Sequence, residues 1–412
     1  VRPNGSGDQT KALQRALDHV IGRHEAWRTT LVDNDDGVVM QRIHAHLPVS
    51  IASVDLREQP PAARDAQAAR LAERDAAEPF DLARGPLLRA TLVVLADDRH
   101  RLLLTAHHAI TDGWSSRCAF DELSAAYCAY AEGREPSLPG LPIQYADYAD
   151  WQRDMLAGGE GERQLDYWRG ALCDVPGPLA LPVDRQPGDA RTLHGARVSV
   201  RLPDAVAADV RQLARDAQAT VFTVLLAALD AWLSRLTGET DVVVAVPVAH
   251  RQRPETRALL GLFLNTVALR VRVAPTLPFR ALVDAARTAA LDAVAHQDVP
   301  FERVVDAVKP PVKRGDEWLR VKFAQQFDAR HDSVLPGATA VATPGPDLAA
   351  RFDFALDFTD DANGIELVAA YATDCIDADT ARAWLDSYAA LVASAAHEPQ
   401  ATTAALPSDA SV

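Results

Sequence analysis

The sequence is poor in cysteine, and it has no long hydrophobic segment. Its 412 residues include only four cysteines, with no Cys-x-x-Cys pair. Neither a disulfide framework nor a zinc ribbon is expected, and free thiols in a reducing cytoplasm are the simplest interpretation. No run of about 18 apolar residues is present, so no membrane span is expected. The N-terminal residues show no signal-peptide pattern.

Basic residues are also scarce relative to acidic ones. Lys and Arg total 42 against 57 for Asp and Glu, which gives a formal net charge of −15. Nucleic acids and anionic membranes bind basic surfaces, so the charge argues against either as a partner. The remaining composition, 48% hydrophobic and 24% charged, is typical of a globular protein. The length favours two domains.

The most informative segment is 104–116, Leu-Thr-Ala-His-His-Ala-Ile-Thr-Asp-Gly-Trp-Ser-Ser. Apolar runs at 92–95 and 102–104 flank a turn and predict a hairpin. Apolar residues recur at helical spacing after Ser115, which predicts a helix that ends near Gly133. His107 and His108 are therefore expected in a short loop between a buried strand and a helix, where reactive side chains are common.

General-base catalysis is the chemistry that this loop permits. An imidazole with an unperturbed pKa of about 6.5 can accept a proton at neutral pH. Asp112 could orient the ring or hold the loop through an ion pair, and Gly113 lets a substrate approach the backbone. No Gly-x-Ser-x-Gly segment is present, which disfavours a covalent acyl-enzyme. Two alternatives stay open at this point, a polar loop without chemistry and a zinc site. Zinc is disfavoured because adjacent histidines on an extended strand point to opposite sides.

Strands and helices alternate in two halves of similar size, which predicts an α/β protein with two lobes. Helices are expected at 8–22, 60–77, 115–133, 145–170, 204–216, 219–236, 278–295 and 378–396. Strands are expected as hairpins over 29–43 and 92–104, at 196–202, 241–248 and 319–327, within 261–273, and as a hairpin of 351–358 with 365–371. The expected domains are a first lobe over 1–175, a proline-rich linker over 176–188, a second lobe over 189–400 and an exit linker over 401–412.

Six blocks resemble the condensation domains of nonribosomal peptide synthetases, in the order typical of that family. The loop at 107–113 resembles the HHxxxDG motif, and 23–29 resembles RHExLRT with Trp27 in place of Leu. The other blocks are 78–89 before the histidine hairpin, 145–151 (YxDYAxW), 261–266 (GxFVNT) and 296–302 (HQDxPFE). Two departures stand out. The family's first, serine-rich block is absent before Val1, and 313–320 lacks the Ser-Arg-Asn-Pro core of RDxSRNPL.

The resemblance implies two lobes like chloramphenicol acetyltransferase, arranged as a V-shaped pseudo-dimer with the active site at the lobe junction. It implies an acyltransferase that joins a donor acyl or peptidyl thioester to the amine of an acceptor aminoacyl thioester. Both substrates would arrive on phosphopantetheine arms of upstream and downstream carrier proteins, with an adenylation domain adjacent. The domain itself would bind no cofactor and no metal.

The resemblance also implies roles for individual residues. His108 would be the functional histidine, either as the base or by positioning the amine, while His107 packs inward. Gly113 would leave room for the thioester and offer its N–H to the oxyanion. For Asp112 we expect a structural ion pair, with Arg28 as the hypothetical partner.

Three further expectations concern specificity and the second lobe. Trp114 and Ser115 resemble the subtype that takes an L-configured donor, and they are expected to line the substrate tunnel. Asn265 and Thr266 are expected in a loop that bridges the lobes, or in plain loop capping. Gln297 and Asp298 are expected to have an architectural role.

Two other functions stay open for this fold. One is an ester-forming or coenzyme A-dependent acyltransferase, although the DFGWG motif of the plant-type enzymes is absent. The other is a catalytically silent domain that recruits carrier proteins, although such relatives lose the second histidine or the glycine of the loop. Cyclisation domains are excluded because both histidines are present.

Overall fold

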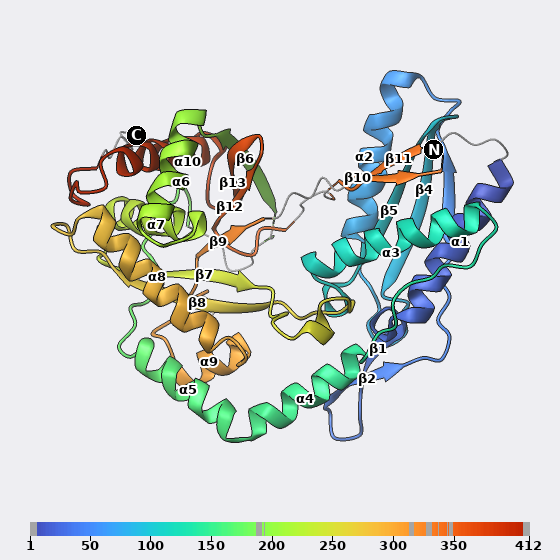
Figure 1. The fold of residues 1–412 in the computed structure, drawn as a ribbon, viewed down its shortest axis with the longest axis horizontal. Helices are drawn as coiled ribbons and strands as arrows, with labels where there is room; N and C mark the ends of the chain where they lie inside the picture. The colour runs from blue at the N-terminus through green and yellow to red at the C-terminus, as the bar shows by residue number, and fades with distance from the viewer. Residues whose placement is uncertain are drawn as a thin grey trace. The chain divides into compact units, whose positions relative to one another are not determined.

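The computed structural model describes residues 6–186, 192, 194–312, 317–326, 332–336, 338–343, 345 and 349–406. The chain forms two compact units (Figure 1). Unit 1 comprises Val1–Asp154, Ala249–Leu264 and Ala329–Pro346, and unit 2 comprises Met155–Val248, Asn265–Asp328 and Asp347–Val412. The α/β class is confirmed. Unit 1 is discontinuous, whereas the expected first lobe was the continuous stretch 1–175.

Unit 1 contains three small sheets and its own helices. Its helices are α1 (Ser6–Arg23), α2 (Pro61–Ala77), α3 (Gly113–Ala131) and most of α4 (Tyr145–Ala157), with 3-10 turns η1 (Glu25–Arg28), η2 (His108–Ile110) and η3 (Pro254–Thr256). Its strands are β1 (Thr29–Asp33), β2 (Val39–Ile43), β3 (Ile51–Asp55), β4 (Leu88–Ala96), β5 (Arg99–Ala106), β10 (Asp332–Leu335) and β11 (Ala338–Val341). Strand β3 runs parallel to β4, and β4 pairs antiparallel with β5, as the predicted hairpin requires.

The core of unit 1 forms where α1 and α3 pack against each other and against strand β4. Leu17 and Val20 of α1 are fully buried, and so are Leu87 and Leu88 at the start of β4. Ile110 of the histidine loop belongs to this same cluster. Ile110 lies two positions after His108, so the packed core anchors the histidine loop through this residue.

Unit 2 is built on a six-stranded mixed sheet with the order β6-β13-β12-β9-β7-β8. The strands are β6 (Gly195–Arg201), β7 (Asp241–Val248), β8 (Asn265–Arg272), β9 (Val321–Gln325), β12 (Phe354–Asp361) and β13 (Gly364–Ala372). The helices are α5 (Gly159–Ala171), α6 (Asp204–Asp216), α7 (Val221–Thr237), α8 (Phe279–Ala295), α9 (Phe301–Val308) and α10 (Ala378–His397). Helices α6, α7, α8 and α10 contact one another and the sheet.

Two stretches that were expected to be linkers contribute to unit 2. In the proline-rich segment, Leu179 and Leu181 are buried in the core of this unit. In the expected exit linker, Leu406 is buried, and the backbone N–H of Thr403 donates to the carbonyl of Leu277. Residues 187–188 and 407–412 of these two expectations lie outside the described residues.

Within the described ranges, no single helix is long and apolar enough to cross a membrane. Helices α6 and α7 would meet that requirement only as a pair, and they are bent by 105° at the break between them. Most of α7 is buried inside unit 2. All four cysteines are free thiols, as predicted.

Helix α7 carries one acidic side chain, Asp230, into the apolar core of unit 2. Asp230 is 1% exposed, and among the described residues neither carboxyl oxygen has a hydrogen-bond partner. Burial raises the pKa of the Asp230 carboxyl well above its usual range. The side chain is therefore a neutral acid in the folded protein, at pH values where the unfolded chain ionises it.

This difference predicts that stability falls as the pH rises. Above a pH of about 4 the unfolded state loses the Asp230 proton and the folded state retains it, which costs up to about 1.4 kcal/mol per pH unit until the folded pKa is reached. In urea unfolding at pH 4.5, 6 and 7.5, Asp230→Asn should gain stability over the wild type as the pH rises. Asp386→Asn, at an exposed site on α10, is the control. A gain that stays constant with pH would contradict the prediction.

Candidate active site

The histidine loop lies where the sequence predicted it, between a strand and a helix. Strand β5 ends at Ala106, and η2 begins at His108. After Thr111 and Asp112, helix α3 begins at Gly113. The two histidines are adjacent in the chain, but their surroundings differ.

His107 contacts the rest of its loop and the neighbouring segment through both its ring and its backbone. Its side chain is half-buried, and the ring meets Phe80 edge-on with a centroid separation of 6.1 Å. The backbone N–H of Ala109 donates to His107 Nδ1 over 3.2 Å, and the N–H of His107 donates to the carbonyl of Leu87. These contacts fix the path of the loop at His107.

His108 is exposed, and one hydrogen bond sets its tautomer. Its Nδ1 lies 2.8 Å from the carbonyl oxygen of Thr111. A carbonyl oxygen only accepts, so Nδ1 carries the proton and Nε2 keeps a free lone pair in the neutral ring. A general base needs such a lone pair on an accessible nitrogen.

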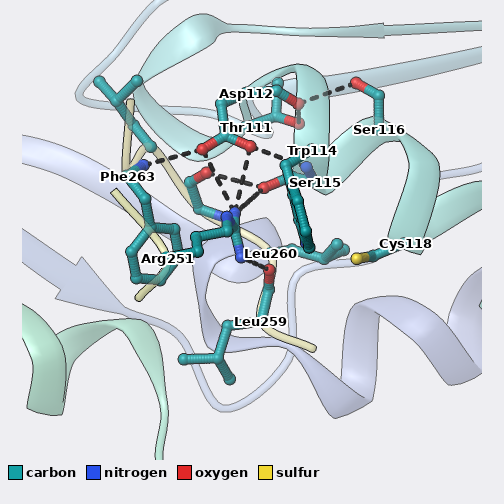
Figure 2. Close-up of polar contacts among 12 residues, drawn as sticks. Thr111, Asp112, Trp114, Ser115, Ser116, Cys118, Arg251, Leu259, Leu260 and Phe263 are labelled. Atoms are coloured by element: carbon teal, nitrogen blue, oxygen red, sulfur yellow. Dashed lines mark hydrogen bonds and ion pairs between the residues drawn. The ribbon is translucent and has the colours of Figure 1, made fainter. Parts of the chain in front are cut away.

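Asp112 is buried at the first turn of α3, where it is the helix N-cap. Its Oδ1 accepts from the N–H of Ser115 over 2.7 Å, and its Oδ2 accepts from the N–H of Phe263 over 3.0 Å. Arg251 Nη2 donates to both carboxylate oxygens, at 3.1 and 3.2 Å (Figure 2). The carboxylate thus joins the histidine loop to the segment 249–264.

Arg251 is the cation that balances Asp112, and it is itself buried. Its Nη1 donates to the carbonyls of Thr256 and Leu259 over 2.6 and 2.7 Å, and its guanidinium lies 4.0 Å from the centroid of the Phe263 ring. Burial lowers the pKa of Arg251, and the charge of Asp112 opposes that shift. Each of the two charges is stable in the interior because the other is present.

The expected pairing of Asp112 with Arg28 is wrong. Arg28 ends η1, where it donates to the carbonyl of His44 over 2.6 Å and forms an ion pair with Glu25 at 3.3 Å. These local contacts occupy the guanidinium of Arg28, and Asp112 takes Arg251, which follows 139 residues later. Arg28 supports the start of β1 instead of the histidine loop.

Ser115 was expected to line the substrate tunnel together with Trp114, and for Ser115 this expectation is wrong. It is 0% exposed. Its hydroxyl donates to the carbonyl of Gly261 and accepts from Arg251 Nη2 and from the N–H of Gly261. Trp114 is 38% exposed, and its Nε1 donates to the carbonyl of Arg257 over 2.9 Å. Of this pair, only the Trp114 ring presents a surface that a substrate could touch.

Gly113 is the first residue of α3, and its surroundings are open. A Cβ added there would meet no atom within 4 Å. The first N–H groups of a helix have no acceptor inside the helix and point outward. The position therefore combines free space with an outward-facing donor, beside the loop that carries His108.

Asn265 and Thr266 begin strand β8 in unit 2, whereas a bridging loop was expected. The Asn265 amide donates to the carbonyls of Gln297 and Val299, both over 2.8 Å. Its oxygen accepts from the N–H of Phe301 over 3.1 Å, at the start of α9. This side chain performs the capping that was the alternative expectation. Gln164 Nε2 donates to Asp298 over 2.9 Å, which fits the architectural role expected for Asp298.

The segment 249–264 was not recognised from the sequence as part of the site, apart from its motif at 261–266. Contacts other than those of Arg251 also join this segment to the rest of unit 1. Tyr148 hydrogen-bonds His250 Nδ1 at 2.8 Å, and the N–H of Leu260 donates to His24 Nδ1. Tyr145 packs so closely that a Cβ on Gly261 would come within 2.2 Å of its ring. This fixed segment is what holds Arg251 beneath the histidine loop.

The Tyr145 hydroxyl is buried near Asp112 and already has a hydrogen-bond acceptor. Burial, with the charge of Asp112 adding to it, raises the pKa of Tyr145 to about 12, and its hydroxyl donates to the carbonyl of Leu262. In the described part of the chain, no group of three or more His, Cys, Asp or Glu side chains is placed to hold a metal ion. The arrangement is therefore one exposed imidazole on a loop locked by a buried ion pair.

Known proteins resemble this chain over nearly its whole length. The condensation-domain family matches residues 5–411. A component of the linear gramicidin synthase of Brevibacillus parabrevis is 39% identical over 406 residues, which cover 96% of this chain and 5% of that protein. The chain thus spans a small part of the synthase that it resembles.

Solved structures share the fold. The X-domain in its complex with OxyB from teicoplanin biosynthesis is 26% identical, with a TM-score of 0.85 over 97% of this chain and 88% of that one. The condensation domain of the monacolin K polyketide synthase MokA is 22% identical, with a TM-score of 0.82 over 95% and 90% of the two chains. The chain therefore belongs to the condensation-domain family of nonribosomal peptide synthetases.

Proposed function

We propose that this chain joins a donor acyl or peptidyl thioester to the amine of an acceptor aminoacyl thioester, with His108 at the reaction centre. The acceptor nitrogen attacks the donor carbonyl carbon, the C–N bond forms and the C–S bond breaks. His108 Nε2 accepts the proton that the amine loses and returns it to the departing thiolate. Atoms and charge balance with no further reagent.

The observation that carries this proposal is the hydrogen bond from His108 Nδ1 to the carbonyl of Thr111. It places the proton of the neutral ring on Nδ1, so that the lone pair is on the outer nitrogen, and it holds the ring in one orientation. A positioned base contributes about 10²–10⁴-fold to a rate, and alignment of the two reactants supplies up to about 7–11 kcal/mol. A thioester is already activated, so these two contributions suffice.

The proposed substrates arrive on phosphopantetheine arms of two carrier proteins, one on each side of the domain in its synthetase, with an adenylation domain as a neighbour. The support is the family and the relative named above, of which this chain covers 5%. The free thiols fit a reducing cytoplasm as the place of reaction. The donor is proposed to be L-configured, because Trp114-Ser115 follows Asp112-Gly113.

The test is a condensation assay read by mass spectrometry. Carrier proteins are loaded with L- or D-donors and with acceptor aminoacyl groups, and coenzyme A thioesters and alcohol acceptors are offered in parallel. An amide from carrier-bound L-donor and acceptor supports the proposal. Product only from coenzyme A or from an alcohol would assign the acyltransferase or ester-forming activity instead, and preference for the D-donor would overturn the donor type.

A second function, recruitment of a partner protein without chemistry, is favoured by one comparison. The X-domain, which shares this fold with a TM-score of 0.85, was solved in a complex with OxyB. A chain of that kind would bind loaded carrier proteins and release no product in the same assay. Binding without turnover from any donor and acceptor pair would therefore assign this function.

The open space at Gly113 leads to a separate prediction. Because a Cβ there meets no atom within 4 Å, Gly113→Ala should fold with a stability within about 1 kcal/mol of the wild type. If the thioester approaches this backbone, the added methyl group should lower kcat/KM for amide formation by at least about tenfold. Thermal melts and assays of the same preparation check both parts. Unchanged kcat/KM would show that the substrate does not approach Gly113.

A further inference from the structure

A small cavity opens next to the histidine loop within unit 1. Its volume is about 140 Å³. It is lined by Ala26 of η1, Thr29 and Leu31 of β1, Gln41 of β2, Ala109 and Ile110 of η2, Tyr145 of α4, and Leu262. None of the contacts described above for the candidate active site explains this cavity.

The wall of the cavity is apolar. Five of its residues have aliphatic side chains. The two hydroxyl groups are occupied elsewhere, because Thr29 Oγ1 donates to the carbonyl of Glu25 and the Tyr145 hydroxyl donates to the carbonyl of Leu262. Gln41 is exposed and lies at the mouth. A group that enters from water therefore exchanges solvent for hydrocarbon, which favours an apolar occupant.

The volume limits what can enter. Pockets for whole small molecules measure about 300–1,000 Å³. A dry apolar cavity of about 150 Å³ binds a group of the size of benzene. The space therefore suits one side chain up to the size of leucine or phenylalanine and excludes the larger indole of tryptophan.

The cavity lies beside the loop that carries His108. Ala109 and Ile110 follow His108 directly and share its 3-10 turn. In an aminoacyl thioester the side chain branches from the carbon between the amine and the carbonyl. A side chain seated against Ala109 and Ile110 would thus bring one of these reacting groups to the loop that carries His108.

We propose that this cavity is a specificity subsite, which binds the apolar side chain of an aminoacyl substrate up to the size of phenylalanine. The inference rests on the proposed amide-forming function and adds the substrate class to it. Leu31 is the residue to change, since it is the aliphatic side chain that strand β1 contributes to the lining.

The test changes the volume of the cavity by substitution of Leu31. Leu31→Trp fills the space and Leu31→Ala enlarges it, and the strand should persist because the N–H of Leu31 keeps the carbonyl of Leu82 as its acceptor. The control is Val39→Trp, on the same hairpin, at a residue that is 61% exposed and outside the lining. Thermal melts establish that all variants are folded.

Each variant is assayed with a series of carrier-bound Gly, Ala, Val, Leu, Phe and Trp groups, first as the acceptor with a fixed donor and then as the donor with a fixed acceptor. In one of the two series, the wild type should favour Leu or Phe over Gly by about tenfold or more. Leu31→Trp should abolish that preference with the Gly rate retained, and Leu31→Ala should extend it to Trp. The series that responds identifies the substrate that uses the subsite.

Equal effects on every side chain in both series, or the same shift in Val39→Trp, would overturn the subsite. A binding measurement separates this failure from failure of the proposed function. In methyl NMR of protein labelled at isoleucine, unreactive leucinamide should shift the Ile110 signal saturably, glycinamide should not, and Leu31→Trp should remove the response. That response without any amide product would retain the subsite and reject the reaction, and no response would reject the subsite.

Discussion

Replacing His108 with alanine is expected to lower kcat for amide formation by about 10²–10⁴-fold, in a protein that stays folded. The side chain is exposed, and its one hydrogen bond joins it to the carbonyl of Thr111 in its own loop. Its removal therefore takes away the proposed proton acceptor and little packing. The measurement is single-turnover amide formation between loaded carrier proteins, with a thermal melt of each preparation.

His107→Ala is the matched control for this experiment. It removes a histidine from the adjacent position, but its Nδ1 holds the N–H of Ala109 and its ring contacts Phe80. Its melting temperature should fall more than that of His108→Ala, and its activity should fall through loss of the loop structure. A folded His108→Ala protein with wild-type kcat would remove His108 from the reaction and leave substrate alignment as the source of catalysis.

Replacing Arg251 with alanine is expected to destabilise unit 1 by about 3–5 kcal/mol, because it leaves the Asp112 carboxylate buried without its cation. The side chains of Arg251 and Asp112 are 1% and 2% exposed, so solvent cannot screen the remaining charge. The loss should appear in the free energy of unfolding by urea. Amide formation should fall with it, since the histidine loop and the segment 249–264 are joined through this pair.

The control is Arg253→Ala, two residues away, where the exposed guanidinium lies over the Trp151 ring at 3.8 Å. A cation–π contact at an exposed site is worth about 0.5–1 kcal/mol, so the change should be small. Asp112→Ala and the double variant complete a double-mutant cycle, which should return a coupling energy well above about 0.5 kcal/mol. Additive losses would show that the two charges do not depend on each other.

The parts of the site that could be predicted were those encoded by neighbours in the sequence. The strand, loop and helix around His108 follow from the spacing of apolar residues in the sequence. Helix α7 was predictable because most of its residues are apolar. Strand β3 and helix α9 escaped notice because they are short, at 5 and 8 residues, and their burial depends on distant partners.

The partner of Asp112 could not be predicted, because nothing local distinguishes one arginine from another. Arg28 belongs to the recognisable block 23–29, whereas Arg251 lies outside the six blocks that resemble the family. Arg251 follows a strand of unit 2, and only the folded chain brings it to Asp112. Ser115 was misassigned for the same reason, since its hydrogen-bond partners in 251–261 are not visible from the sequence around it.

The sequence separation of 139 between Asp112 and Arg251 has a consequence during synthesis of the protein. A ribosome adds about 5–20 residues per second, so Asp112 leaves the peptidyl-transferase centre roughly 7–28 s before its cation does. During that interval the first stretch of unit 1, Val1–Asp154, lacks the segment that carries Arg251. The buried ion pair of the histidine loop can therefore form only after the first stretch of the neighbouring unit, Met155–Val248, has been translated.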